Sequence, residues 1–378
     1  MKRRIVLINF CNGLFGGIES FLINIFRGLD KDEYEAHFLT CGETTYSMYR
    51  DDIESCGGFV EEIPINANTI LKRLKLYKEL LIYFRKSTPD IVHINSGGLS
   101  YHFIAGLAAS RCGIKQIILH SHNFIPLKSG INYFLKKPIK KQIVKYGTHF
   151  LACSLGAAYW IFPKEIVEHG DVEIIPNGID ASYFRFDDNK RKSFRKELGI
   201  TDELILGHIG RFQTQKNHEF LINVMRIVLT NIPNAKLLLV GEGELKEHIK
   251  GLIQEYGMDE HVIFLGERKD LDFFYSAIDI FLLPSLFEGF GIVAIEAQAS
   301  GAKTILSSRV PKETNVTGEA VYLSIENQTE RLWAQEIALN ASSNKDVVWA
   351  RKDEWHKVIK AGYDINELID RMRKVYLT

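Results

Sequence analysis

The feature that most constrains the fold is an alternation of short apolar runs with longer amphipathic stretches along nearly the whole chain. Short runs rich in valine, isoleucine and leucine that lie between helical patterns are typical of parallel strands covered by helices on both faces. The first half of the pattern predicts strands at residues 4–10, 34–41, 59–64, 90–95, 116–120, 149–154 and 172–176, and helices at 18–29, 70–86, 99–111 and 131–146. We therefore expect a doubly wound α/β fold.

The pattern stops at a polar stretch, residues 180–195, and then resumes. The second half predicts strands at residues 204–211, 236–240, 262–265, 280–284, 303–306 and 320–323. A chain of 378 residues is too long for one ordinary core. We predict two domains, residues 1–178 and 179–363, with a ligand in the cleft between them. The final helix, residues 364–378, carries an apolar face and must pack on another element.

Composition excludes several functional classes. The formal net charge is zero, so no polyanion such as nucleic acid is implied as a partner. The five cysteines are scattered without a CxxC pair, which argues against a disulfide framework and a zinc site. We expect no metal ion and no other cofactor. Without an apolar run of eighteen residues, we expect a cytoplasmic protein.

The richest motif lies at residues 279–301, which read as a strand, a loop and an alanine-rich helix. Glu288 lies in the loop, and Glu296 lies eight residues later inside the helix. Between them, Gly289, Phe290 and Gly291 open the helix with little side chain in the way. The free N–H groups of a helix start form an anion site. Two carboxylates beside such a site suit a ligand that is part phosphate and part polyol, such as a nucleotide sugar.

The two glutamates allow more than one interpretation. They could be the general acid and the nucleophile of a glycoside hydrolase. Alternatively, Glu296 accepts hydrogen bonds from ribose hydroxyls while Glu288 contacts a sugar. They could also be solvated helix residues, although the apolar neighbours of Glu296 indicate that it is buried, and a buried carboxylate needs a partner.

Two cations follow the first strand of the second half. Arg211 and Lys216 flank a loop between Gly210 and Asn217 that ends where a helix begins. An arginine and a lysine at such a turn can clamp a diphosphate. The alternative is a pair of solvated surface cations, but the position after a strand favours the clamp.

Three further loops after strands carry weaker signals. Gly16 and Gly17 follow the first strand in a spacing that differs from the dinucleotide fingerprint GxGxxG. Gly241 and Gly243, and then Arg268, follow later strands at places where a sheet contacts a base or a ribose. Each of these three motifs is equally explained by a tight turn without a ligand.

Two histidines, His120 and His122, lie two residues apart at the end of the fifth predicted strand. We expect their rings to point to opposite faces, which argues against joint ligation of one metal. One ring is then functional and the other structural, and His120 is the favoured candidate.

Taken in order, these motifs resemble those of a retaining glycosyltransferase of family 4. The set comprises Gly-Gly-Ile-Glu at 16–19, a histidine after a later strand, Pro-Asn-Gly-Ile-Asp at 176–180, Gly-Arg-x5-Asn at 210–217, Gly-x-Gly at 241–243, and Glu-Gly-Phe-Gly-x4-Glu at 288–296. The resemblance covers essentially the whole chain and is closest to bacterial exopolysaccharide and capsule enzymes. It implies the GT-B fold: two tandem Rossmann-like domains that face a cleft, with the C-terminal helix crossing back onto the first domain.

The resemblance also implies residue roles. Arg211 and Lys216 would neutralise the diphosphate of the donor in place of a metal ion, and Glu296 would hold the ribose. Glu288 and the backbone around Phe290 would contact the transferred sugar, with His120 from the first domain. Further donor contacts are implied at Gly16, Gly17, Gly210, Asn217, Gly241, Gly243, Arg268, Gly289 and Gly291. The donor would be a UDP-sugar, and the acceptor a glycan or a polyprenyl-diphosphate-linked sugar.

The stretch from residue 91 to residue 164 contains no aspartate or glutamate. Within it, Lys136, Lys137, Lys140 and Lys141 lie among apolar residues in a predicted helix. Basic amphipathic helices bind anionic membrane surfaces, so we expect peripheral contact with the inner face of the cell membrane. The alternative is a solvated basic helix face.

Two other functions remain open on the sequence. A GT-B nucleotide-sugar epimerase would use the same donor site without an acceptor, and the basic stretch argues mildly against it. A catalytically inactive partner subunit would share the fold, but intact His120, Arg211, Lys216, Glu288 and Glu296 argue against decay.

Overall fold

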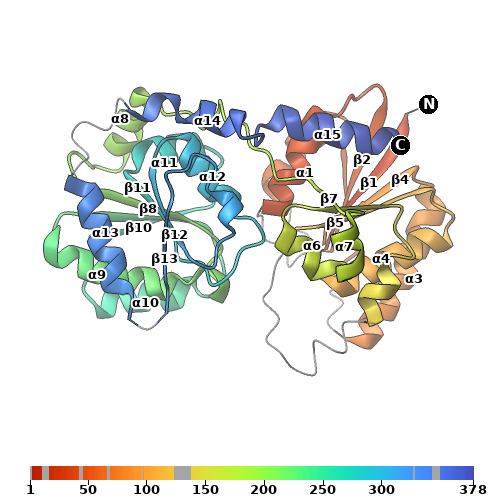
Figure 1. Ribbon diagram of the computed structural model, residues 1–378, viewed down its shortest axis with the longest axis horizontal. Coiled ribbons are helices and arrows are strands. Elements are labelled where there is room, and N and C mark those ends of the chain that lie inside the picture. The colour runs from red at the N-terminus through yellow and green to blue at the C-terminus, as the bar shows by residue number, and fades with distance from the viewer. Residues whose placement is uncertain are drawn as a thin grey trace. The chain divides into compact units, whose positions relative to one another are not determined.

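The computed structural model describes residues 2–10, 17–41, 46–65, 69–96, 98–122, 138–326, 328–342 and 350–378 (Figure 1). The chain forms two compact units. Unit 1 is Met1–Gly178 together with Asn366–Thr378, and unit 2 is Ile179–Ile365. Each unit contains one parallel sheet with its own helices, and each is described separately below.

Unit 1 contains a seven-stranded sheet in the order β3-β2-β1-β4-β5-β6-β7, and all neighbouring strands are parallel. The strands are β1 (Arg3–Asn9), β2 (Tyr34–Thr40), β3 (Phe59–Glu62), β4 (Ile91–Ile94), β5 (Gln116–Ser121), β6 (His149–Ala152) and β7 (Glu173–Ile174). All seven predicted strands are therefore confirmed. Central strands such as β4 and β5 are buried along their whole length, which explains their uninterrupted apolar sequence.

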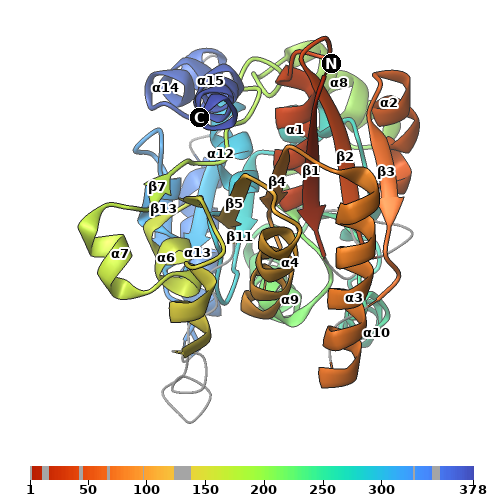
Figure 2. The same cartoon turned by 90° about the vertical axis from the view of Figure 1, so that its right-hand side faces the viewer.

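The helices of unit 1 cover both faces of this sheet. They are α1 (Gly17–Gly28), α2 (Arg50–Ser55), α3 (Ile70–Ser87), α4 (Leu99–Arg111), α6 (Leu155–Ile161), α7 (Lys164–His169) and α15 (Ile365–Leu377). Residues 138–143 are also helical. Helices α1 and α15 share a core with Ile5 and Ile118 on one face, whereas Gly106 of α4 packs toward Leu119 on the other. Helices α3 and α4 lie side by side (Figure 2).

The last helix belongs to the core of unit 1. Leu368, Met372, Val375 and Tyr376 of α15 are buried in the same cluster as α1 and the central strands. Polar contacts reinforce this packing, because the Gln116 side chain donates to the carbonyl of Val375 at 2.6 Å. The apolar face predicted for the final helix is thereby confirmed, and its partner is unit 1.

Unit 2 contains a six-stranded parallel sheet in the order β10-β9-β8-β11-β12-β13. Its strands are β8 (Ile205–Ile209), β9 (Lys236–Val240), β10 (Val262–Gly266), β11 (Ile280–Leu283), β12 (Lys303–Ser307) and β13 (Val321–Leu323). Its helices are α8 (Asp188–Glu197), α9 (His218–Asn231), α10 (Lys246–Glu255), α11 (Leu271–Ala277), α12 (Ile292–Ala299), α13 (Glu330–Ser342) and α14 (Glu354–Lys360), with short 3-10 turns that include η2 (Thr214–Lys216). The predicted doubly wound architecture is confirmed in both halves.

Both sheets reverse their strand order at one point. In unit 1 the first strand β1 lies between β2 and β4, and in unit 2 the equivalent β8 lies between β9 and β11. Doubly wound sheets bind ligands at the carboxyl ends of the strands beside such a reversal. A ligand site is therefore expected at the loops after β8 and β11 in unit 2. In unit 1 it is expected at the loops after β1, β4 and β5.

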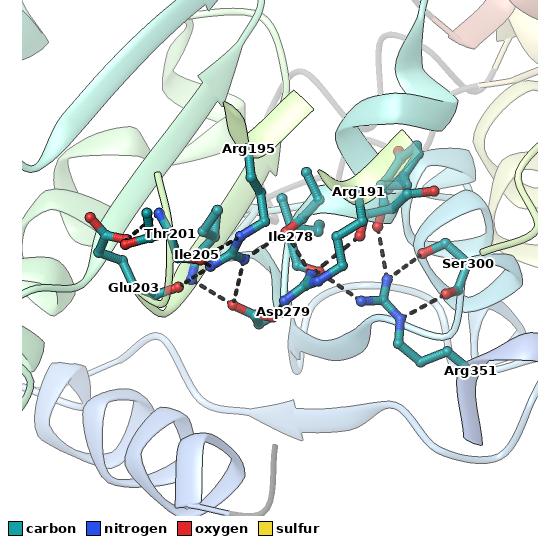
Figure 3. Close-up of polar contacts among 12 residues, drawn as sticks. Arg191, Arg195, Thr201, Glu203, Ile205, Ile278, Asp279, Ser300 and Arg351 are labelled. Atoms are coloured by element: carbon teal, nitrogen blue, oxygen red, sulfur yellow. Dashed lines mark hydrogen bonds and ion pairs between the residues drawn. The ribbon is translucent and has the colours of Figure 1, made fainter. Parts of the chain in front are cut away.

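At the opposite edge of the unit 2 sheet, buried arginines tie distant segments together (Figure 3). Arg191 and Arg195 of α8 bind the carboxylate of Asp279 at 2.6 and 3.5 Å. Arg351, only 4% exposed, donates to the carbonyls of Tyr275, Ile278 and Ser300. These carbonyls lie at or just after the C-termini of α11 and α12, where backbone acceptors lack helical partners. The network is therefore structural and fixes the amino end of β11.

Of the helices in the described part of the chain, none combines the length and the apolar character needed to cross a bilayer. Cys41, Cys56, Cys112 and Cys153 form no disulfide bonds with one another.

Candidate functional site

Two loops meet where the strand order of unit 2 reverses. The loop after β8 ends at η2 and Asn217, and the loop after β11 runs from Pro284 to Gly291. They are joined by hydrogen bonds, because Leu286 N–H donates to the Gln215 carbonyl at 2.8 Å and the Asn217 amide donates to the Pro284 carbonyl at 3.2 Å. Both predicted motifs of this unit are thereby brought to one place at the ligand-binding edge.

The centre of this place is an ion pair between two residues predicted from separate motifs. Lys216 Nζ lies 2.6 Å from Glu288 Oε1, and the two side chains are only 14% and 8% exposed. Ser285 Oγ donates to the same carboxylate oxygen at 2.6 Å. Lys216 is therefore not a solvated surface cation. Glu288 holds the Lys216 ammonium in place. This pairing fits a lysine that is positioned for an anionic ligand better than it fits Glu288 as a free catalytic acid.

Arg211, the second predicted cation, lies close to Glu267. Burial and the neighbouring Glu242 raise the pKa of Glu267, while Arg211 acts in the opposite direction. The loop glycines fit tightly together nearby. Gly241 has φ 133°, and a Cβ there would lie 2.3 Å from the Gly210 carbonyl oxygen. Close backbone packing thus explains glycine at these positions, and a donor contact by Gly210, Gly241 or Gly243 stays a prediction.

The helix start after Glu288 has the predicted form. Gly291 has φ 88° and caps α12, which begins at Ile292. Gly289, Phe290 and Gly291 are buried, and the Phe290 ring stacks on Tyr363 with centroids 5.6 Å apart. Gly291 adopts a left-handed conformation that a residue with a Cβ would adopt only with strain, which explains glycine where α12 begins. The first backbone N–H groups of α12 have no acceptor within the helix.

Glu296 is buried inside α12, as its apolar neighbours predicted, and its partner is Tyr275 of α11. The Tyr275 hydroxyl lies 2.7 Å from Glu296 Oε2 and 3.0 Å from the Val293 carbonyl. Burial raises the pKa of Glu296 to about 7, and the hydrogen bond with Tyr275 acts in the opposite direction. Both protonation states are accommodated, because Tyr275 can donate to the carboxylate or, when Glu296 is protonated, accept from it and donate to Val293.

Arg268 has a full set of partners that needs no ligand. Its guanidinium binds Asp270 through two hydrogen bonds of 2.8 and 2.6 Å and lies 4.7 Å from the centroid of the Phe194 ring. A donor contact by Arg268 remains a prediction that these structural contacts do not require.

Sequence reasoning missed two histidines beside the ion pair. His208 is the fourth residue of β8 and donates from Nδ1 to the Leu282 carbonyl at 2.8 Å, while His218 begins α9 and stacks on Phe212. Burial lowers the pKa of His208 to about 4 and that of His218 to about 2, so both are neutral. No spacing signal distinguishes them from ordinary core histidines.

In unit 1, His120 and His122 lie at the end of β5 and are both buried. Their ring centroids are 4.0 Å apart, and both rings pack on Phe21 of α1. The expectation that they point to opposite faces is wrong. Residues i and i+2 of a strand share a face, so the two rings are neighbours and act on the same side of the sheet.

Two more side chains complete this cluster. His93 of β4 contacts His120 at 3.1 Å between Nε2 and Nδ1, and the hydroxyl of Tyr376 from α15 lies 2.8 Å from His93 Nδ1. Neither residue was predicted, since Tyr376 and His93 are separated by 283 positions in the chain. Gly17 is the first residue of α1, whereas Gly16, Lys136 and Lys137 lie outside the described residues.

In the described ranges, no group of three or more histidine, cysteine, aspartate or glutamate side chains is arranged to hold a metal ion. The described charged side chains at the unit 2 site include the Lys216–Glu288 pair, with Arg211 in the same loop as Lys216.

Comparison with known proteins agrees with the fold. Residues 15–183 match the family model "Glycosyltransferase Family 4", and residues 189–374 match "Glycosyl transferases group 1". EpsF of Bacillus subtilis is 28% identical over 369 residues, covering 96% of this chain and 93% of the relative. The UDP-Gal:alpha-D-GlcNAc-diphosphoundecaprenol alpha-1,3-galactosyltransferase of Escherichia coli is 24% identical over 371 residues, covering 96% and 94%.

Among solved structures, Anabaena HepE in complex with UDP-glucose superposes with a TM-score of 0.78 at 17% identity, covering 99% of both chains. WaaG, a glycosyltransferase involved in lipopolysaccharide biosynthesis, gives a TM-score of 0.71 at 14% identity, covering 98% of this chain and 99% of WaaG. These likenesses show the GT-B fold, and the two family models account for both halves in the order that the motifs predicted. The chain therefore belongs to the family 4-type glycosyltransferases with the GT-B fold.

Proposed function

We propose that this glycosyltransferase moves a sugar from a UDP-sugar donor to a glycan or polyprenyl-diphosphate-linked acceptor, with retention of anomeric configuration and without a metal ion. The observation that carries the proposal is the buried Lys216–Glu288 pair at the strand-order reversal of unit 2. The Escherichia coli relative, whose name specifies a UDP-galactose donor and a diphosphoundecaprenol-linked acceptor, supports the choice of substrates.

The leaving group of this reaction is a nucleoside diphosphate, on which negative charge builds as the glycosidic bond breaks. Fixed cations stabilise that charge, and Lys216 is fixed because Glu288 and the surrounding loop hold its ammonium. Arg211, from the same loop, is the second cation of the proposed clamp. The N–H groups at the start of α12 provide further donors for the same anion.

The transferred sugar passes through an oxocarbenium-like state. Both oxygens of Glu288 have partners, with Ser285 and Lys216 at Oε1 and Gln215 at Oε2. A carboxylate engaged in this way suits hydrogen bonding to the sugar better than covalent attack on it. We therefore propose that the acceptor hydroxyl attacks from the face that the diphosphate leaves, which retains the configuration.

The direct test is nucleotide release. Purified protein is incubated with UDP-, GDP- and ADP-sugars, each with and without a polyprenyl-diphosphate-linked acceptor, and NMR of the product gives the anomeric configuration. We expect UDP release only when the acceptor is present. We also expect the transferred sugar to keep in the product the anomeric configuration that it has in the donor. Isomerised UDP-sugar without transfer would indicate an epimerase, and no release from any donor by folded protein would indicate an inactive subunit.

A pH dependence of nucleotide binding follows from Glu296. Ribose hydroxyls donate to a carboxylate, so binding requires the ionised form of a group whose pKa burial has raised to about 7. The dissociation constant of UDP is therefore expected to fall by about 10-fold between pH 6 and pH 8, with one proton released on binding at low pH. Calorimetry in buffers of different ionisation enthalpy measures both quantities.

The matched control is Glu296→Gln, which removes the titration while keeping the shape. Its dissociation constant should follow only the ionisation of the nucleotide itself, and equal slopes for both proteins would remove Glu296 from the ribose site. Stability changes in the opposite sense. Because the folded state holds the proton more tightly than the unfolded chain, with its ordinary pKa of 4.5, the free energy of unfolding falls as pH rises from 4.5 to 7.

We also propose peripheral contact with an anionic membrane through the cluster Lys136, Lys137, Lys140 and Lys141, at the cytoplasmic face. In the described part of this cluster, Lys141 is exposed, while Lys140 donates to the carbonyl of Tyr159 at 2.6 Å. The vesicle experiment in the next subsection tests this cluster beside a second surface.

A further inference from the structure

The first turns of α3 expose an apolar surface of unusual size for one helix end. Ile70, Leu71 and Leu74 are 73%, 79% and 56% exposed, although each is a large aliphatic side chain. Thr69 caps the helix by accepting a hydrogen bond from Lys72 N–H, so these residues belong to a formed helix. Contiguous exposed apolar side chains of this kind mark an interaction surface.

The charges around this apolar turn identify the partner. Lys72, Arg73, Lys75 and Lys78 surround it, and residues 70–78 contain no acidic side chain. Lys72, Lys75 and Lys78 are exposed. An apolar turn within a ring of cations fits an anionic lipid surface, where the aliphatic groups enter the acyl region and the cations meet headgroups. Two copies of the same cationic surface would repel one another.

The position of the turn in the fold points the same way. Helix α3 begins directly after β3, so its N-terminal turns lie at the carboxyl edge of the unit 1 sheet. His120 and His122 end β5 at this same edge. A membrane bound there would bring a lipid-linked acceptor to the edge at which a doubly wound sheet binds its ligands.

We propose that the turn formed by Ile70, Leu71 and Leu74 inserts into an anionic membrane and anchors unit 1. The proposal deepens the membrane contact of the proposed function by assigning it to α3 instead of, or in addition to, the lysine cluster. The prediction concerns binding alone, so it holds whether or not the protein transfers a sugar.

Sedimentation with vesicles tests the two surfaces separately. Wild-type protein should bind vesicles containing about 30% phosphatidylglycerol and not pure phosphatidylcholine. Leu71→Ser/Leu74→Ser should weaken binding by at least about 10-fold, since each substitution removes an aliphatic side chain that the membrane would bury. The matched control Leu339→Ser, which alters a leucine 69% exposed on α13 of unit 2, should bind as wild type does.

The second variant reverses charge at Lys136, Lys137, Lys140 and Lys141. Retained binding by this variant together with release of Leu71→Ser/Leu74→Ser supports α3 and removes the lysine cluster. Undiminished binding by the α3 variant, or failure of the wild type to bind anionic vesicles, overturns the α3 proposal.

A second inference comes from the buried histidines of unit 1. Tyr376, His93 and His120 form a chain of hydrogen bonds at 2.8 and 3.1 Å, and all three side chains are fully buried. The chain ends at His120 Nε2, which has no partner within the described part of the protein. A buried polar atom left open at the ligand edge of a sheet indicates a group that a ligand completes.

The direction of the hydrogen bonds follows from counting donors. A neutral imidazole has one N–H and one lone pair, so between His93 and His120 one ring donates and the other accepts. If Tyr376 donates to His93 Nδ1, then His93 Nε2–H donates to His120 Nδ1, and His120 carries its proton on Nε2. The reverse direction would also leave the hydroxyl hydrogen of Tyr376 unpaired in the core, because His93 is its one hydrogen-bond partner in the described residues.

His122 presents a hydrogen-bond acceptor where His120 presents a donor. Asn95 donates from Nδ2 to the His93 carbonyl at 3.0 Å, which fixes its amide, so its Oδ1 accepts from His122 Nε2 at 2.9 Å. No hydrogen bond of normal geometry reaches His122 Nδ1 among the described residues, so it is left as a lone pair, and the nearby Asn177 side chain acts to raise the pKa of His122. An open donor on His120 and an open acceptor on His122, on adjacent rings, match a hydroxyl, which both accepts and donates.

We infer that Tyr376 and His93 are positioning residues that fix His120 in the Nε2–H tautomer, so that His120 and His122 together bind one hydroxyl of the substrate. The hydroxyl contact rests on the proposed function, whereas the tautomer is a property of the protein alone. The two can therefore fail independently.

Long-range ¹H–¹⁵N NMR of histidine-labelled protein reads the tautomer without substrate. We expect His120 to be protonated at Nε2 in the wild type and to become a mixture of tautomers in Tyr376→Phe, with kcat/KM for transfer reduced by about 5-fold. His93→Gln, whose amide N–H can still donate to His120, should preserve the tautomer and most activity, whereas His93→Leu should lose both. A wild-type proton on Nδ1 of His120, or an unchanged tautomer in both Tyr376→Phe and His93→Leu, overturns the inference. Absence of transfer with the expected tautomer counts against the proposed function only.

Discussion

Replacing Lys216 by methionine is expected to lower kcat/KM for sugar transfer by about 10²- to 10³-fold, the magnitude seen when one fixed donor to a developing anion is removed. Methionine keeps most of the volume of the lysine stem and removes the ammonium that lies 2.6 Å from Glu288. Because the charge builds on the leaving diphosphate, the loss should appear in kcat as well as in KM. Release of UDP under single-turnover and steady-state conditions separates these contributions, and added Mg²⁺ should not restore the rate.

Loss of stability could imitate loss of function here, since the variant leaves the carboxylate of Glu288 buried without its cation. Breaking one partner of a buried pair costs about 3 kcal/mol or more. The double variant Lys216→Met/Glu288→Gln removes both charges and should recover much of the free energy of unfolding without recovering activity. Recovery of activity in the double variant would show that Lys216 serves only to neutralise Glu288.

Lys190→Met is the matched control for a lysine at an ion pair. Lys190 of α8 binds the buried Asp272 of α11 at 2.5 Å, and neither residue is among the predicted site residues. It should lower the midpoint of urea unfolding while leaving kcat/KM within about 2-fold of wild type.

Deleting residues 366–378 is expected to prevent unit 1 from folding, although the deleted helix is as far from β1 in the sequence as the chain allows. The deletion removes four buried side chains, Leu368, Met372, Val375 and Tyr376, from the core of unit 1. Truncating one such side chain costs about 2–5 kcal/mol, and a whole domain is stable by only about 5–15 kcal/mol. Hydrogen exchange should therefore show unprotected amides in β1, β4 and β5.

The matched control removes only Leu377 and Thr378. Leu377 is 69% exposed, so this shorter chain should fold with protection close to that of the full protein. Native protection of β1 and β5 in the chain that lacks residues 366–378 would show that α15 is an accessory to unit 1 and not part of its core.

The central strands were predictable because each is an apolar run that the parallel sheet buries on both faces. Ile91–Ile94 and Ile280–Leu283 are examples, and no tertiary information is needed to recognise them. The short helices α2, α6 and α7 were not predicted, because six or seven residues give too little periodicity to recognise a helical face.

The sequence identified Lys216, Glu288 and Glu296 as candidates, but it did not reveal their contacts. Lys216 and Glu288 each follow a strand, and only the adjacency of β8 and β11 brings them to 2.6 Å across 72 positions of the chain. The need of Glu296 for a partner was evident from its apolar neighbours, but nothing in the sequence designated Tyr275. The error over His120 and His122 was one of strand geometry, since alternate residues share a face.

The return of α15 to unit 1 has a consequence for synthesis on the ribosome. Unit 2, Ile179–Ile365, is a continuous segment and has all its residues before the last helix is translated. Unit 1 emerges first but lacks Tyr376 and its neighbours until residues 366–378 have been translated, so the core around Ile5 and Ile118 stays incomplete while unit 2 is synthesised. Unit 1 therefore emerges before unit 2 but is completed after it. A nascent chain stalled before residue 366 should expose the α15-binding face of unit 1 to chaperones and proteases.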